Sequence, residues 1–232
     1  THTTGAFHSN PIVTRAYGFD EGFDKFDDDL YLSRHRLVAL AQRFWDKLRH
    51  RHYARAESIN GRALIWLDSL EDEPFFLWNH YMDPHSPYCP PPGYEDRYPE
   101  VITSNKRAQD LYERACTSPG TISNTERRCL VDSYDAELQY LDDSLAGFFD
   151  ALETRGLLEE TLVIVTADHG DAFGEEGMYG HPRSPLNSLL DIPFLIRSPE
   201  MKPDRVKSAV STLDIVPTIL SMLGRSDDSL PG

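Results

Sequence analysis

Three short apolar runs along the chain predict strands. Residues 162–165 form a continuous apolar run, the pattern of a strand covered on both faces in a parallel sheet. Residues 75–78 follow Pro74 and predict a second buried strand. Residues 192–196 predict a third strand, and Pro193 favours a place near a sheet edge, because proline cannot donate to the hydrogen-bond ladder.

Helical periodicity appears in three further stretches. Between residues 130 and 152, apolar side chains recur every three or four positions, which predicts one apolar stripe along a helix that packs on the sheet and ends at Gly156. The stripe consists of Leu130, Tyr134, Leu138, Leu141, Leu145, Phe148 and Leu152. Similar spacing predicts a helix over residues 37–48, and another over residues 215–223 that begins at an Asp214 cap.

The order of these elements predicts the fold class. Strands alternate with helices across short connections, which gives an α/β fold with a mostly parallel sheet and helices on both faces, in three layers. The glycine- and aromatic-rich opening (17–26) is expected to be irregular, and a polar region lies at 103–125, before the long helix. The 232 residues can bury one substantial core, so residues 1–232 are expected to form a single domain.

Composition narrows the class of protein. A hydrophobic content of 40% and an aromatic content of 11% indicate a globular chain. No stretch approaches the roughly 18 consecutive apolar residues of a membrane span. No signal-peptide pattern is visible, which favours a cytoplasmic location but leaves the compartment open. Cys89, Cys116 and Cys129 are too widely spaced for a disulfide framework or a paired zinc knuckle.

The net charge of −15 disfavours two kinds of partner, nucleic acid and an anionic membrane surface. A surface dominated by Asp and Glu repels both nucleic acid and an anionic membrane. Lysine is also scarce, with 5 Lys against 18 Arg among the 23 basic residues. This acidic, lysine-poor composition resembles that of proteins from salt-loving organisms, although an ordinary acidic protein has the same signs.

The end of the predicted strand at 162–165 carries the first candidate chemistry. Asp168 and His169 follow that strand directly, and open α/β sheets bind ligands at the carboxyl ends of their strands. A hard oxygen ligand beside an imidazole is a plausible half of a divalent-metal site. The alternative is that Asp168 caps a helix, supported by Asp171 three residues later.

Histidines provide the remaining candidates. His85 lies in the loop 83–93, whose five prolines fix the backbone and would hold the imidazole in place, unless the loop is only a proline-rich surface turn. His80, at the end of a strand, is expected to serve packing or support. A group formed by Asp46, His50 and His52 is interrupted by arginines that would repel a cation, so we interpret it as a solvated face.

Four segments, taken in order along the chain, resemble the sulfatases of the alkaline phosphatase superfamily. They are Thr-Gly-Ala-Phe-His-Ser-Asn-Pro (4–11) with Tyr-Gly-Phe-Asp-Glu-Gly-Phe-Asp (17–24), Asp-Pro-His-Ser-Pro-Tyr (83–88), Thr-Ala-Asp-His-Gly (166–170) with Gly-Glu-Glu-Gly-Met-Tyr-Gly-His (174–181), and Ser-Thr-Leu-Asp-Ile-Val-Pro-Thr-Ile-Leu (211–220). Each match is short, but the four come in the family's order and span most of the chain.

The resemblance implies hydrolysis of a sulfate ester, carried by a small molecule or a carbohydrate. Family enzymes use a formylglycine, made from Cys or Ser, whose hydrate attacks sulfur, while a divalent cation binds a sulfate oxygen. That cation is usually Ca²⁺, with Mg²⁺ or Mn²⁺ as alternatives. Asp168 and His169 would be two of its ligands. His85 and His181 would lie beside the sulfate, where they could donate hydrogen bonds or move the leaving-group proton.

Departures from the family pattern limit this expectation. The family's paired N-terminal aspartates and its nucleophile normally precede the point where this sequence begins, and no Cys-x-Pro-x-Arg or Ser-x-Pro-x-Arg segment occurs in it. Arylsulfatases commonly carry lysine where His181 stands. We therefore expect a fragment, incomplete at both ends and lacking the C-terminal subdomain, that is inactive by itself.

Two other functions remain open. One is hydrolysis of a phosphate or phosphonate ester by the same superfamily. Two-metal phosphatases often carry Asp-x-x-x-His before the Asp-His motif, whereas Asp135 is followed four residues later by Gln139, which favours the one-metal sulfatase design. The other is a non-catalytic module that retains the fold. The oligomeric state is left open.

Overall fold

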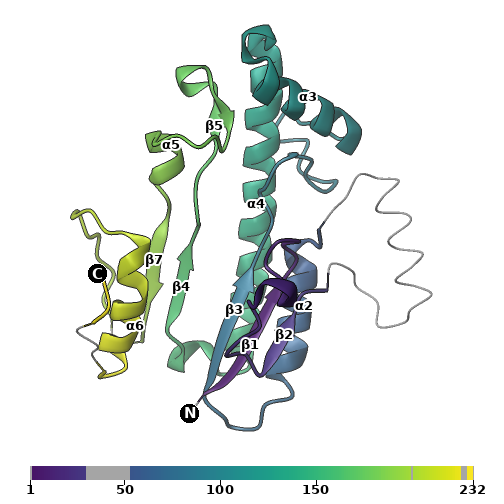
Figure 1. Cartoon of the computed structure of the whole chain (residues 1–232). Coiled ribbons are helices and arrows are strands. Elements are labelled where there is room, and N and C mark those ends of the chain that lie inside the picture. The colour runs from purple at the N-terminus through teal and green to yellow at the C-terminus, as the bar shows by residue number, and fades with distance from the viewer. Residues whose placement is uncertain (1, 30–52, 200, 226–228, 232) are drawn as a thin grey trace. The chain divides into compact units, whose positions relative to one another are not determined.

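The computed structural model describes residues 2–29, 53–199, 201–225 and 229–231. Its backbone divides into two compact units, one formed by Thr1–Leu158 with Asp171–Ser184 and the other by Glu159–Gly170 with Pro185–Gly232. Figure 1 shows the chain coloured from the N-terminus to the C-terminus, with the helices and strands labelled. The predicted helix over 37–48 and the group of Asp46, His50 and His52 lie outside the described residues.

A parallel sheet forms the centre of the first unit. Its strands are β1 (Thr3–His8), β2 (Lys25–Asp27) and β3 (Phe75–His80), in the order β2-β1-β3. Both pairs are parallel, so Ala6 stands beside Phe26 on one side and Trp78 on the other. The strand predicted at residues 75–78 is therefore confirmed, and so is the α/β class with a parallel sheet and helices.

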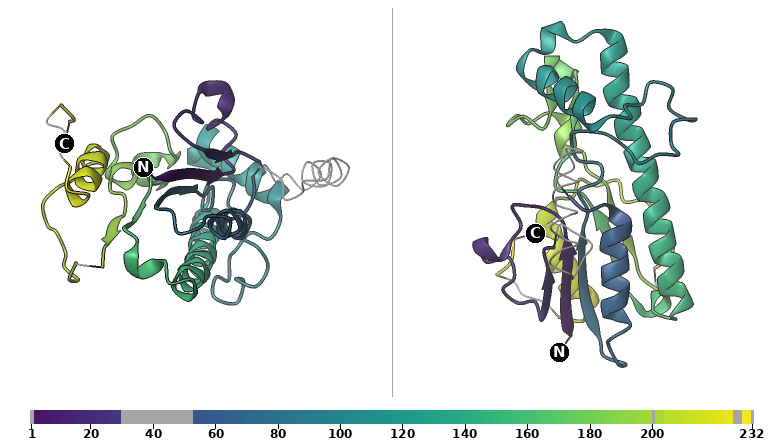
Figure 2. Two further views of the ribbon diagram at one scale, coloured as in Figure 1. Left: turned by 90° about the horizontal axis from the view of Figure 1, so that it is seen from below. Right: turned by 90° about the vertical axis from the view of Figure 1, so that its right-hand side faces the viewer.

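Two helices lie on one side of this sheet. The helix α2 (Ala56–Leu67) packs on β1 and β3, and α4 (Asn124–Thr154) packs against α2 (Figure 2). The approach is close at Gly5, where a Cβ atom would lie 2.8 Å from the Trp66 ring, so the strand needs glycine there. Phe7 from the sheet joins the buried cluster that α2 and the second half of α4 complete.

Aromatic rings from the opening segment cover the sheet's other face. Phe23 stacks on Trp78 with ring centroids 6.0 Å apart and also contacts Phe26 and Phe76. Gly22 precedes it with φ of +88°, a backbone conformation that favours glycine. The segment predicted to be irregular therefore ends in a strand, β2, and contributes to the core.

The long helix α4 confirms the prediction over residues 130–152. A capping box between Ser123 and Glu126 begins it, and Gly156, with φ of +70°, follows its end. One assignment within the stripe was wrong: the Leu138 side chain faces out with 40% of its surface exposed, whereas Glu137 is fully buried. No described helix combines the length and the apolar character needed to cross a membrane.

A second core surrounds the first half of α4. It brings together the loop after β3, the helix α3 (Asn105–Thr117) and a hairpin of β5 (Ala172–Phe173) and β6 (Tyr179–Gly180). Its buried residues are Tyr88, Cys89, Ile102, Ala108, Leu111, Ala115, Cys129 and Leu130. The polar region 103–125, for which no element was predicted, contains α3, whose narrow apolar face consists of Ala108, Leu111 and Ala115.

The second unit contains the strands β4 (Val163–Thr166) and β7 (Phe194–Arg197) and the helices α5 (Asn187–Leu190) and α6 (Ile215–Met222). Both predicted strands are confirmed, but β4 pairs antiparallel with β7 and is half-buried, where a covered parallel strand was predicted. The predicted cap of the last helix was also wrong. Asp214 stands at the N-cap position of α6, but its carboxylate accepts no hydrogen bond from that helix. It accepts one from the Ser211 amide instead and completes the capping box of the preceding 3-10 turn.

Candidate active site

The loop after β3 presents His85. The Nδ1 atom of His85 lies 2.7 Å from the Ser86 carbonyl oxygen, so the proton of a neutral ring sits on Nδ1, and Nε2 is the nitrogen left for other contacts. Tyr53 donates its hydroxyl to the His85 carbonyl at 3.1 Å. The loop is more than a surface turn, because Asp83, Tyr88 and Cys89 are all buried.

A hairpin brings His181 beside His85. β5 and β6 pair antiparallel, and His181 follows β6 directly. The two imidazole rings lie with their centroids 5.3 Å apart and their planes inclined by 53°. Gly180 allows this path, because it has φ of +70° and a Cβ atom there would lie 2.2 Å from the Tyr112 hydroxyl. The structure therefore brings together two of the four predicted site residues within one unit.

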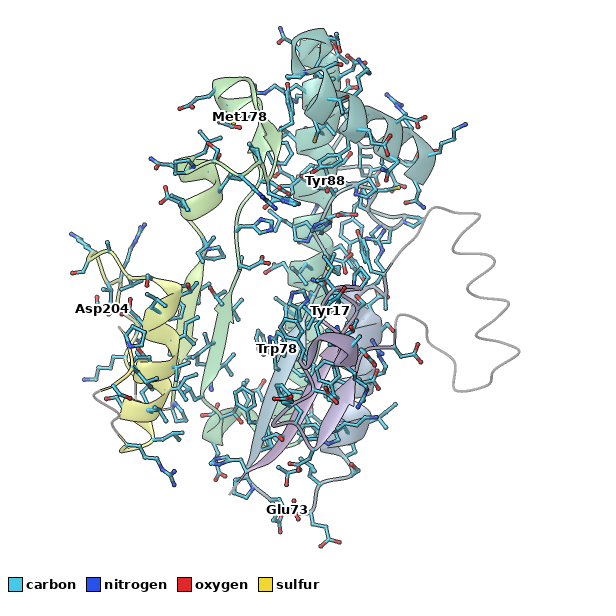
Figure 3. All side chains as sticks on the ribbon, viewed as in Figure 1. Tyr17, Glu73, Trp78, Tyr88, Met178 and Asp204 are labelled. Carbon is cyan, nitrogen blue, oxygen red and sulfur yellow. The ribbon has the colours of Figure 1, made fainter. Side chains whose placement is uncertain are left out.

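Tyr88 fastens the hairpin to the His85 loop. Its hydroxyl donates to Asp171 Oδ2 at 2.6 Å, and its ring packs against Tyr134 and Phe173 in the second core, beside α4 (Figure 3). Burial raises the pKa of Tyr88 far above its ordinary value, which keeps the hydroxyl a donor. The alternative that Asp168 caps a helix, with support from Asp171, was wrong, because no helix begins there and β5 follows Asp171.

Both ends of the His85 loop also meet a buried charge cluster, which we call the loop clamp: Arg55, Asp83 and Glu137. Arg55 Nη1 lies 2.8 Å from Asp83 Oδ1 and 3.2 Å from Glu137 Oε1. The Ala56 amide donates to Asp83 Oδ2 at 2.9 Å, so Asp83 also serves the beginning of α2. At the other end of the loop, the Cys89 amide donates to Glu137 Oε1 at 3.0 Å, and Arg55 Nη2 donates to the Cys89 carbonyl.

The loop clamp stabilises the anionic form of Glu137 only incompletely. One guanidinium serves two carboxylates, and Glu137 Oε2 accepts no hydrogen bond among the residues that the structure describes. Burial therefore raises the pKa of Glu137 from 4.5 to about 8, and Arg55 opposes this shift only in part. Sequence reasoning missed Arg55 and Glu137. The available signal was a carboxylate lying within the arc of a predicted apolar stripe.

Asp168 and His169 lie together in the second unit, at the end of β4. The His169 amide donates to Asp168 Oδ1 at 3.0 Å, and His169 Nδ1 lies 2.8 Å from the Gly170 carbonyl oxygen. A neutral ring thus keeps its proton on Nδ1 and carries its lone pair on Nε2, which lies 3.9 Å from Asp168 Oδ2. Two donors that share one ion are separated by roughly 3–4.5 Å, so this pair fits a divalent cation.

These two side chains alone do not make a metal site. Over the described ranges, no three His, Cys, Asp or Glu side chains gather so as to hold a metal. The turn that carries the pair is sterically fixed. The Gly170 amide donates to the Leu189 carbonyl at 2.9 Å, and a Cβ atom on Gly170 would lie 2.0 Å from the Ser188 carbonyl oxygen. Glycine is thus required for the close approach of this turn to α5.

Comparison with known proteins identifies the family. The Sulfatase family profile matches residues 1–225. The uncharacterized sulfatase YidJ of Escherichia coli is 29% identical over 191 residues, which are 76% of this chain and 38% of YidJ. N-acetylglucosamine-6-sulfatase of Bos taurus is 26% identical over 223 residues, covering 82% of this chain and 40% of that protein.

Solved structures show the same fold. The phosphonate monoester hydrolase of Agrobacterium radiobacter superposes with a TM-score of 0.69 at 17% identity, over 96% of this chain and 56% of the hydrolase. The chain spans about two fifths of the length of the two sequence relatives named above. The order of its motifs, its fold and the match over residues 1–225 together show that the chain belongs to the sulfatase family.

Proposed function

We propose that the complete encoded protein hydrolyses a sulfate ester with the help of a divalent cation. The observation that carries this proposal is the pairing of His85 and His181, whose rings lie 5.3 Å apart on two loops that Tyr88 and Asp171 join. Two imidazoles at this separation can face one anionic group. The family match over residues 1–225 supports sulfate as the ester group.

The two histidines have different proposed roles. Because Nδ1 of His85 is engaged with the Ser86 carbonyl, Nε2 of His85 is the atom that would donate to a sulfate oxygen when the ring is protonated. His181 follows Gly180 directly and is exposed, which suits a group that exchanges a proton with a leaving alcohol. Hydrogen bonds to the sulfate oxygens would strengthen as charge develops in the transition state.

Asp168 and His169 are proposed to hold the divalent cation, with Ca²⁺ as the first choice. Their oxygen and nitrogen donors suit such an ion, and the Gly170 carbonyl fixes the tautomer of His169. When bound, the cation would supply positive charge next to an ester oxygen. The remaining ligands are proposed to come from residues outside this sequence.

The nucleophile is also proposed to lie outside the 232 residues. No Cys-x-Pro-x-Arg or Ser-x-Pro-x-Arg segment occurs in them, and the chain spans only 38% and 40% of two relatives. We propose a formylglycine at that position in the complete protein. The isolated chain should accordingly hydrolyse nothing, which makes it the negative control for the activity of the complete protein.

A phosphonate ester is the second candidate substrate, favoured by the structural similarity to a phosphonate monoester hydrolase. The sequence relative from Bos taurus is named for a sulfated sugar, which favours a carbohydrate sulfate instead. Assays of the complete protein with an aryl sulfate, a glucosamine 6-sulfate and a phenyl phosphonate ester separate the two. We expect the highest kcat/KM for a sulfate ester, and a higher value for the phosphonate would reverse the assignment.

A further inference from the structure

Burying the side chains of the loop clamp carries a desolvation penalty. The side chains of Asp83 and Glu137 are 0% exposed and that of Arg55 is 12% exposed, so three ionisable groups are shielded from water. Replacing a buried ionic cluster by apolar side chains of similar volume is often neutral or stabilising. Stability alone therefore gives no reason for this cluster, and its placement around the His85 loop suggests a geometric role.

The clamp acts close to His85 on both sides. Asp83 stands two residues before His85, and Cys89, whose amide and carbonyl both meet the clamp, stands four residues after it. Between these anchors Pro84 and Pro87 each fix a φ angle, which leaves the loop few internal rotations. A displacement of either anchor is therefore passed to the His85 ring instead of being absorbed within the loop.

We propose that Arg55 and Glu137 are positioning residues that set the place of His85 relative to the bound ester. The inference rests on the proposed function, because only that function gives His85 a substrate. Glu137 acts through its acceptor oxygen, which takes the Cys89 amide, and Arg55 acts through its fork, which reaches Asp83, Glu137 and the Cys89 carbonyl at once.

Two variants of Glu137 isolate this acceptor. Glu137→Gln keeps an oxygen for the Cys89 amide and resembles the protonated acid, the form that a raised pKa favours. Glu137→Leu keeps the volume and removes the acceptor. In the complete protein we expect kcat/KM of the Gln variant to stay within about threefold of wild type and that of the Leu variant to fall about 100-fold, the cost of a misplacement near 1 Å.

A double-mutant cycle distinguishes positioning from general damage. If Glu137 acts through His85, the double variant His85→Gln/Glu137→Leu should have a kcat/KM less than about threefold below that of His85→Gln alone. Additive losses in the two variants would overturn the proposal. Arg62→Leu is the matched control: it breaks another half-buried ion pair on α2, with Asp27, and its effect should add to that of His85→Gln.

A spectroscopic readout keeps the test independent of activity. ¹⁵N NMR of labelled histidine reports the tautomer of His85, which should be Nδ1-protonated in wild type and in Glu137→Gln, and mixed in Glu137→Leu. Unchanged His85 signals in Glu137→Leu would overturn the positioning role even if the complete protein hydrolyses no ester. If the wild-type complete protein hydrolyses no ester but the His85 signals change as expected, only the proposed function is refuted. If Glu137→Leu does not fold, Arg55→Lys, which cannot span the three partners, replaces it under the same criteria.

Discussion

The raised pKa of Glu137 makes the stability of the protein depend on pH in a defined direction. Its pKa is 4.5 when unfolded and about 8 when folded, because burial disfavours the anion. Between these values the folded protein binds the proton and the unfolded chain releases it, so the free energy of unfolding falls as pH rises. Below the unfolded pKa this contribution is fully present, and above the folded pKa it is lost.

Replacement of Glu137 by Gln removes this single titration. The slope for one proton is about 1.4 kcal/mol per pH unit, so the stability of Glu137→Gln relative to wild type should rise by about 2–3 kcal/mol between about pH 5 and pH 7. Urea unfolding of both proteins across this range measures the difference, in which the titrations that they share cancel. A difference that stays flat, or that falls with pH, would refute the assignment of a raised pKa.

Three further predictions concern single contacts and the surface charge. Gly170→Ala should destabilise the protein by about 1–3 kcal/mol, because the added Cβ would clash with the Ser188 carbonyl oxygen. Gly147→Ala is the control: it lies in helix α4, its added Cβ has no atom within 4 Å, and it should stabilise the protein by about 0.5–1 kcal/mol. Thermal melts of both variants measure the difference. Tyr88→Phe removes the donor to Asp171 and should lower the free energy of unfolding by about 1–3 kcal/mol. The control Tyr94→Phe, whose partner Asp143 is exposed, should lower it by less than about 0.5 kcal/mol. Equal urea midpoints for the two variants would count against the role of Tyr88 in holding the hairpin to the His85 loop. With a net charge of −15, unfolding midpoints should rise as KCl increases from about 0.1 M to about 1 M, because salt screens the repulsion between acidic side chains. Over this range the Debye length falls from about 10 Å to about 3 Å. No rise would exclude the halophile interpretation.

Local patterns predicted the regular elements whose apolar residues are large. The strands at 75–78, 162–165 and 192–196 and the long helix all appear. The strand β1 escaped prediction because Gly5 and Ala6 replace large side chains, and Gly5 does so to admit the Trp66 ring. The helix α3 escaped for a similar reason, since its buried face consists of two alanines and one leucine.

Glu137 shows where periodicity fails. Positions 137 and 138 both fall within the arc of the stripe, and hydrophobicity alone favours Leu138. The structure reverses the choice, because Arg55, 82 residues earlier, supplies the partner that a buried carboxylate needs. Such a long-range partner leaves no periodic signal in the sequence.

The candidate site was predictable only in part. The turn of Asp168 and His169 after a strand follows from local sequence, and the structure has it. The approach of His85 and His181 was implied by family resemblance, since no spacing rule joins two loops so far apart. The bond from Tyr88 to Asp171, across 83 residues, depends on tertiary packing alone.

The most direct test of the proposed function is sulfate release from an aryl sulfate by the complete encoded protein, before and after removal of divalent cations. We predict release that stops in EDTA, returns with Ca²⁺, and requires a higher Ca²⁺ concentration in Asp168→Asn than in wild type. Sulfate release that persists in EDTA, or an unchanged Ca²⁺ requirement in Asp168→Asn, would contradict the assignment of Asp168 and His169 as ligands of a catalytic cation.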